Sequence, residues 1–128
     1  MIYKERYIQE SVVYYLRVRH SDVLFCASAG GMRTYWTQAK LMKRLGYSKG
    51  FPDLFIYEPA GNYKGMAIEF KSDKGRLTFE QSYWLKELEK RGYYVYIGRN
   101  VNETIKEIEK YLNFRKEGEE NVKNKEKN

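Results

Sequence analysis

The sequence predicts a single α/β domain in which helices flank a small mixed β-sheet. Segments with helical periodicity alternate with short apolar segments over the first 114 residues, which is typical of this fold class. Two predicted strands are joined by a turn and a further strand follows a long helix, so we expect antiparallel and parallel pairing in one sheet. The chain of 128 residues is long enough for one domain of ordinary size.

Four elements are predicted in the first half of the chain. Apolar side chains recur every three or four positions over residues 4–19 and predict the first helix. The run Val-Leu-Phe-Cys at 23–26 predicts a short strand, and a second helix is expected at 34–45, where Gly46 ends it. A strand is expected at 54–57, and the Pro, Gly and Asn residues that follow it predict a turn.

The second half begins with the strand that returns from this turn, at 66–71. A helix is expected over 78–91, because a Thr-x-x-Gln capping box opens it and a glycine closes it. The β-rich run at 93–97 predicts the last strand, and Asn102 is expected to cap a final helix. The predicted order is helix, strand, helix, two strands, helix, strand and helix.

The composition changes after Phe114. Residues 115–128 include five basic and four acidic side chains and a single apolar one. A segment of this kind cannot bury enough apolar surface to fold by itself. We therefore expect one ordered domain at 1–114 and a charged, disordered tail at 115–128.

The overall composition restricts the classes of function. No apolar run approaches the length of a membrane span, and the charged N-terminal residues lack the apolar core of a signal peptide. A single cysteine cannot form a disulfide within the chain. One cysteine and one histidine cannot supply the ligands of a zinc site, so any bound metal is expected to have oxygen ligands. A net charge of +7 favours a polyanionic partner, with nucleic acid ahead of an anionic membrane.

Two short segments, 50–54 (Gly-Phe-Pro-Asp-Leu) and 68–71 (Ile-Glu-Phe-Lys), carry the candidate chemistry. Side chains alternate along a strand, so Glu69 and Lys71 are expected on one face, and a hairpin brings Asp53 near Glu69. Converging carboxylates repel each other unless a cation lies between them, and Mg²⁺ suits such oxygen ligands. Lys71 is then placed to act on an attacking water or on transition-state charge. The structural alternative is an ordinary turn followed by an exposed strand.

These segments and their surroundings resemble the virus-type replication-repair nuclease (VRR-NUC) domain of the PD-(D/E)XK nuclease superfamily. The resemblance rests on GFPDLFIYEP and on GMAIEFKSDKGRLTFEQSYWLKELEKRGYYVYI. In addition, KERYIQESVVYYL is similar to the opening helix of that family, and SAGGMRT to its Gly-Gly-x-Arg loop. Together the matching segments extend over about residues 4–98.

The resemblance implies a restriction-endonuclease-like core and metal-dependent hydrolysis of phosphodiester bonds. By motif, Asp53, Glu69 and the backbone carbonyl of Phe70 correspond to metal ligands, and Lys71 corresponds to the catalytic lysine. The implied cofactor is Mg²⁺ or Mn²⁺. The implied function is a DNA endonuclease selective for branched or Holliday-junction DNA in phage or bacterial replication, repair or recombination. Its expected location is the cytoplasm of a bacterial or phage-infected host cell.

Two further residues have both a structural and a functional interpretation. Glu5 shares a helix face with Gln9, and the family pattern places such an acid near the site. Glu10 is the competing candidate, and a solvated acid that suits the helix dipole is the structural alternative for Glu5. Gln81 completes the capping box, yet the family also has a Gln here, close to the catalytic strand, so we expect a role beside the site.

Phosphate contacts are expected from Arg33 in the segment after the glycine loop and from Lys74 and Arg76 after the catalytic strand. Two alternatives to the DNA nuclease stay open at this point. One is a module of the same fold that binds nucleic acid without cutting it. The other is a nuclease that acts on RNA.

A homodimer is expected, because one metal site cuts one strand at a time and the resemblance is to small stand-alone nucleases that pair two sites. Tyr3, Tyr7, Tyr14 and Trp36 supply more aromatic surface than one small core holds. Exposed aromatic patches often mark contacts between subunits.

Overall fold

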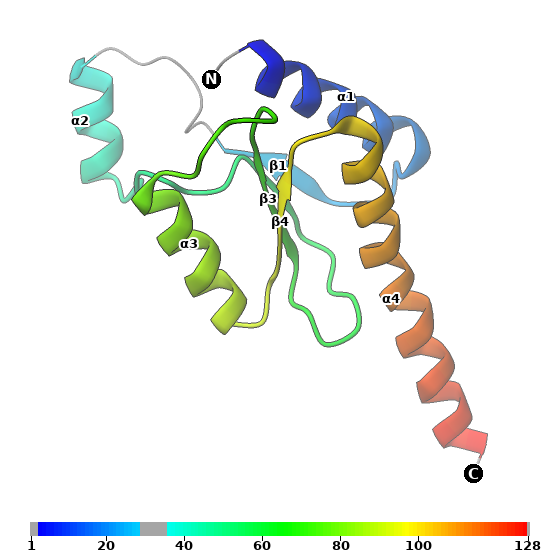
Figure 1. The fold of residues 1–128 in the computed structure, drawn as a ribbon. Coiled ribbons are helices and arrows are strands. Elements are labelled where there is room, and N and C mark those ends of the chain that lie inside the picture. The colour runs from blue at the N-terminus through cyan, green and yellow to red at the C-terminus, as the bar shows by residue number, and fades with distance from the viewer. Residues whose placement is uncertain (1–2, 29–35, 128) are drawn as a thin grey trace.

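The computed structural model describes residues 3–28 and 36–127 of the chain, and it confirms the predicted fold class (Figure 1). The helices are α1 (Tyr3–Arg19), α2 (Trp36–Arg44), α3 (Phe79–Lys90) and α4 (Val101–Lys127). The strands are β1 (Phe25–Ala27), β2 (Leu54–Ile56), β3 (Met66–Phe70) and β4 (Tyr94–Gly98). The predicted elements are all present, although several differ at their ends by one or two residues and α4 differs by more.

The four strands form one mixed sheet in the order β1-β2-β3-β4. β2 pairs antiparallel with both β1 and β3, whereas β4 runs parallel to β3. The parallel pair is joined by α3, as the crossover of a βαβ unit requires. In the hairpin register Leu54 lies opposite Ile68, which fixes how the two strands present their remaining side chains.

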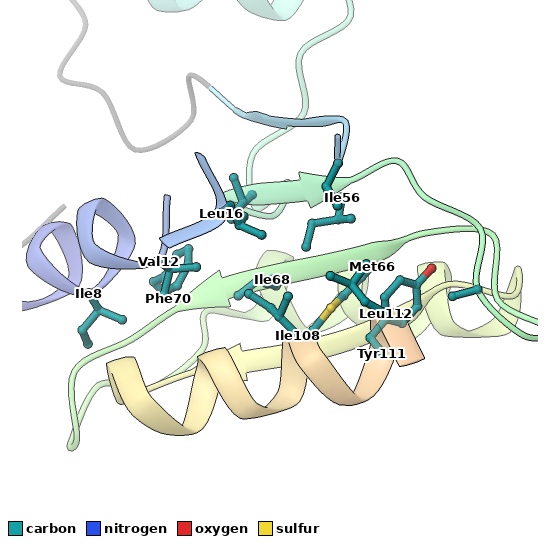
Figure 2. Close-up of a cluster of buried hydrophobic side chains, with 13 residues drawn as sticks. Ile8, Val12, Leu16, Ile56, Met66, Ile68, Phe70, Ile108, Tyr111 and Leu112 are labelled. Atoms are coloured by element: carbon teal, nitrogen blue, oxygen red, sulfur yellow. The ribbon is translucent and has the colours of Figure 1, made fainter. Parts of the chain in front are cut away.

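Helices cover both faces of the sheet: α1 and α4 lie together on one face and α3 lies on the other (Figure 1). The main core forms between the sheet and the helix pair, where apolar side chains of α1, α4 and the sheet are almost completely buried (Figure 2). Its labelled members are Ile8, Val12 and Leu16 of α1, Ile56, Met66, Ile68 and Phe70 of the sheet, and Ile108, Tyr111 and Leu112 of α4. A smaller cluster of Phe55, Ala67 and Leu88 lies beneath α3.

α2 lies apart from these layers, beyond the N-terminal end of α3 (Figure 1). Its side chains from Thr37 to Arg44 are exposed except for the half-buried Met42. The helix contains three basic residues and no acidic one.

α4 differs from its prediction at both ends. It begins at Val101, and its cap is Asn100 rather than Asn102, because the Asn100 side-chain oxygen accepts the Glu103 backbone N–H at 3.1 Å. At the other end the helix continues through the segment predicted as a tail. Phe114 is the last residue of α4 that is described as packing against the main core. Glu and Lys are good helix formers, and extending a helix that is already anchored needs no new nucleus. The domain boundary at 114 stays a prediction.

Although α4 is long, its residues are mostly polar, so it does not have the composition of a membrane-spanning helix. Within the described part of the chain, no helix is both long and apolar enough to cross a bilayer.

Candidate active site

The two candidate carboxylates meet where the β2–β3 hairpin ends. Continuing the register by one residue from the Leu54–Ile68 pair places Asp53 directly opposite Glu69, so both side chains lie on the same face of the sheet. The Phe70 backbone N–H donates a hydrogen bond of 2.8 Å to Asp53 Oδ2 and holds that carboxylate in place. Asp53 is 8% exposed and Glu69 is 3% exposed. The hairpin therefore buries two acids side by side.

Burial and nearby negative charges make both acids hard to ionise. Burial raises the pKa of Glu69 to about 8, and the negative charge of Asp53 adds to the rise. Burial also raises the pKa of Asp53, although its hydrogen bond from Phe70 acts in the opposite direction. The ammonium group of Lys71, which is 9% exposed, lowers both pKa values without cancelling the rise. A divalent cation between the carboxylates would reverse this penalty.

The donor set fits such a cation. Glu69 Oε2 is buried and accepts no hydrogen bond from the described residues. The same is true of Gln9 Oε1. A buried carboxylate oxygen without a donor is costly unless something else satisfies it. No group of three or more His, Cys, Asp or Glu side chains in the described ranges is arranged to hold a metal. Further ligands would have to come from the main chain or from water, and the Phe70 carbonyl stays a prediction for this role.

A cavity of about 270 Å³ opens above the acids and brings the predicted residues together. Its lining includes Asp53, Glu69, Lys71, Gln81 and Glu5. Glu5 is half-buried, and its negative charge contributes to the raised pKa of both central acids.

The competing candidate on α1, Glu10, is exposed and does not line this cavity. Of the two acids of α1, Glu5 is thus the one that lies at the cavity, and its role there stays a prediction.

Gln81 combines its two predicted roles. Its side-chain oxygen accepts the Thr78 backbone N–H at 2.9 Å, and its own backbone N–H donates to Thr78 Oγ1 at 3.1 Å, which completes the capping box. Both residues also line the cavity. The first turn of α3 is therefore part of the site wall as well as a helix start.

The loop before Asp53 packs against this same turn. Gly50 has a φ of +91°, and a Cβ atom added there would lie 2.5 Å from the Glu80 backbone carbon. Only glycine fits, both for the backbone conformation and for the space. This contact fixes the position of α3 relative to the acids.

The predicted phosphate-binding residues are only partly placed. Lys74 and Arg76 are exposed on the loop that follows Lys71, outside the cavity lining. Arg33 lies outside the described residues, as does the predicted glycine loop apart from its first residue, Ser28.

Three residues of the site region were missed by the sequence analysis. Tyr47 and Lys49 line the cavity, and burial raises the pKa of Tyr47, with smaller contributions from Asp53 and Glu69. The guanidinium of Arg99 donates hydrogen bonds of 2.7 Å to two carbonyl oxygens of the loop after Lys71. Tyr47 and Lys49 belong to a loop without periodicity, and Arg99 follows the distant strand β4, so no local pattern indicates these contacts.

The fold and the buried pair of acids with a lysine define a nuclease-type α/β domain. The family model of the VRR-NUC domain matches residues 2–101, and the chain belongs to this family. A solved structure described as a VRR_NUC domain protein shares the fold, with a TM-score of 0.75 and 24% sequence identity. The similarity covers 89% of this chain and 92% of that chain. No curated protein matches the sequence.

Proposed function

We propose that this protein is a Mg²⁺- or Mn²⁺-dependent DNA endonuclease that hydrolyses phosphodiester bonds. The observation that carries the proposal is the buried Asp53–Glu69 pair, in which one Glu69 oxygen has no donor among the described residues while Lys71 lies on the same side. Membership of the VRR-NUC family and the net charge of +7 support a nucleic acid as substrate.

Each residue has a role that follows from its chemistry. Asp53 and Glu69 would hold the metal, with the Phe70 carbonyl as a further ligand. A bound divalent cation supplies an activated water and neutralises charge on the phosphate. Lys71 would orient that water or stabilise the negative charge of the transition state.

The remaining residues of the cavity would position these groups. Glu5 lies close enough to influence the charge of both acids and would act as an outer ligand or hold a metal-bound water. Gln81 has its oxygen engaged in the capping box, so its NH₂ group is the part that would orient a ligand. Arg33, Lys74 and Arg76 would contact phosphates of the DNA backbone. Of these, Lys74 and Arg76 are exposed and lie outside the cavity lining.

The proposal is tested by incubating the purified protein with branched, flapped, nicked and linear DNA in Mg²⁺, in Mn²⁺ and in EDTA. We expect cleavage with either metal, none in EDTA, and a preference for branched substrates. Lys71→Ala should lose cleavage but retain metal binding in calorimetry. Equal cutting with and without EDTA would contradict the proposal.

Glu5 and Glu10 provide a matched pair for the same assay. Glu5→Gln should slow cleavage, whereas Glu10→Gln, on the same helix but exposed, should leave it unchanged. Equal rates in the two variants would remove Glu5 from the site.

The two alternatives make different predictions in this assay. A binding module of the same fold would retain DNA without cutting it in either metal. A nuclease that acts on RNA would digest RNA faster than DNA of the same sequence.

The proposed assembly is a homodimer, which would pair two sites on branched DNA. Two of the predicted interface residues, Tyr7 and Tyr14, are 59% and 71% exposed, and Val18 continues their line along α1. Residues spaced by seven and four positions share one helix face, and a two-fold interface uses one such patch twice. The structure does not describe the side chains of Tyr3 and Trp36. Light scattering should give about twice the 15.4 kDa of one chain.

The proposed biological role rests on the family and on the expected substrates. The family and the expected substrates suit replication, repair or recombination of phage or bacterial DNA in the cytoplasm of the host cell.

A further inference from the structure

A second cavity, of about 470 Å³, lies beside the candidate active site along the outer side of α3. Three aromatic side chains of that helix line it: Phe79, Tyr83 and Trp84. Phe79 is 84% exposed, the highest value for any large apolar side chain in the described ranges, and Tyr83 is 56% exposed. Trp84 is half-buried and packs edge-on against Phe51, with 5.1 Å between the ring centroids. The cavity therefore presents exposed aromatic rings to solvent, next to a Trp84 ring that is packed against Phe51.

This aromatic cavity is rigidly connected to the carboxylate site. Lys49 lines both cavities, so one cation stands at their boundary. The close contact between Gly50 and the Glu80 backbone fixes the first turn of α3 against the loop that precedes Asp53. Phe79 also lies between Thr78 and Gln81, which both line the carboxylate cavity. A ligand on the Phe79 ring would thus be held at a set position relative to the acids.

The charges of the aromatic cavity favour a neutral ligand. Its lining contains two cations, Lys49 and Arg91, and two carboxylates, Glu80 and Glu87. Glu87 is already paired with Arg91 and with Lys90 at 3.4 Å each. A phosphate group would gain little in such balanced surroundings. A flat, uncharged ring gains from stacking on Phe79 and Tyr83, and the phosphate attached to it would lie toward Lys49.

We infer that the aromatic cavity binds an unpaired nucleobase of the DNA strand whose phosphate enters the carboxylate site. The inference rests on the proposed function and adds to it a binding site for one base of the substrate. Bases inside a duplex are covered on both faces by their neighbours, so only an unstacked base can lie on Phe79. DNA with a flap, gap or junction beside the cut therefore binds better than intact duplex.

Binding of DNA that carries 2-aminopurine at single positions near a flap tests the inference. The measurement is made in EDTA, so that binding is read without cleavage. We expect fluorescence quenching at one or two positions next to the branch. Phe79→Ala should abolish the quenching and weaken flap binding by about 5- to 150-fold, the range that one stacked base contributes. It should leave binding to intact duplex unchanged, and Phe79→Trp should restore flap binding.

Tyr57→Ala is the matched control. Tyr57 is also exposed, at 48%, but it follows the opposite end of β2 from Asp53. Flap affinity that falls equally in the Phe79→Ala and Tyr57→Ala variants would overturn the inference. So would an equal loss on flap and duplex, or no loss on either. A change from dimer to monomer in light scattering of Phe79→Ala would overturn it in favour of a subunit contact.

The outcomes separate this inference from the proposed function. Metal-dependent cleavage by the parent protein without quenching at any position would refute the nucleobase site and leave the nuclease standing. Quenching that depends on Phe79, in a protein that cuts neither DNA nor RNA, would support the nucleobase site and refute the nuclease.

Discussion

The two faces of strand β3 are buried to nearly the same extent but differ completely in chemistry. On one face Met66, Ile68 and Phe70 lie in the apolar core beneath α1 and α4 and are at most 1% exposed (Figure 2). On the other face Glu69, and Lys71 directly after the strand, are 3% and 9% exposed and border a polar cavity. One short strand thus supplies both the centre of the core and the centre of the site.

The comparison shows what burial means on each side. An apolar side chain taken out of water stabilises the fold by roughly 1.5–3 kcal/mol. An acid or a lysine taken out of water costs free energy unless it is paired, and Glu69 retains an oxygen without a donor among the described residues. The core face stabilises the domain, and the site face uses part of that stability to hold reactive groups in place.

The largest effect is expected for removing one charge from the site face. Glu69→Gln keeps the shape of the side chain but removes a carboxylate that is proposed to bind the metal, so cleavage should fall by about 10³-fold or more. In EDTA the same variant should melt at a higher temperature than the parent, because it has no carboxylate whose charge burial and Asp53 disfavour. Steady-state cleavage and thermal melting measure the two effects.

Glu10→Gln is the matched control for Glu69→Gln, since that acid is exposed on α1. Cleavage by Glu69→Gln at the rate of the parent would show that the buried acid on the polar face of β3 is not needed for activity.

The opposite pattern is expected on the core face. Ile68→Ala should lower the free energy of unfolding by about 2–5 kcal/mol, and Ile68→Val by about 0.5–1.5 kcal/mol. At temperatures where both variants are folded, their cleavage rates should stay near that of the parent. Denaturant melts combined with cleavage assays give the result, and a loss of activity without a loss of stability would mean that the two faces are not separable.

The pH dependence of stability provides a third, smaller effect. Glu69 has a pKa near 4.5 when unfolded and about 8 when folded, so the folded state binds the extra proton between these values. Without metal, the free energy of unfolding should therefore fall as pH rises from about 5 to 8, by up to about 1.4 kcal/mol per pH unit for one proton. Melting curves in EDTA should show this decline.

Two conditions should flatten the decline with pH: the Glu69→Gln substitution, and saturating Mg²⁺, which favours the ionised carboxylates. A parent protein whose stability in EDTA rises over the same pH range would show that Glu69 is ionised in the folded state.

The smallest effect, on DNA affinity, is expected for removing the end of α4, which is far from both faces of β3. Deleting residues 117–128 removes four acids and three lysines and leaves the Arg115–Glu58 contact of 3.9 Å in place. Because DNA affinity should depend on phosphate contacts of the domain, the slope of log affinity against log salt should be unchanged. A clearly shallower slope in a salt titration of the truncated protein would identify the segment as part of the DNA-binding surface.

The central site was predictable because its parts lie on one hairpin. The alternation of side chains along 66–71 and the pairing of the two strands suffice to bring Asp53, Glu69 and Lys71 to one face. The exposure of Glu10 was also predictable, since Glu10 lies two residues, or about 200°, from the core residue Ile8 around the helix. Turning Ile8 inward necessarily turns Glu10 toward solvent.

Other features were beyond the local patterns. Asn100 and Asn102 are both good caps, and the helix start was decided by where β4 ends and α4 meets the sheet. Charged residues after Phe114 indicate a tail on composition, whereas their individual helix propensities suit the continuation seen in α4.

The sequence by itself determined the order of the elements, the mixed sheet and the paired acids with their lysine, because all of these follow from periodicity and from short-range pairing. Only the tertiary structure decided that Tyr47 and Lys49 enter the cavity, that Arg99 holds the loop after Lys71, and that the exposed Phe79 ring lines the neighbouring cavity. These features depend on how a loop, a helix and a distant strand pack against one another. Such contacts join residues far apart in the chain, and no repeating local pattern encodes them.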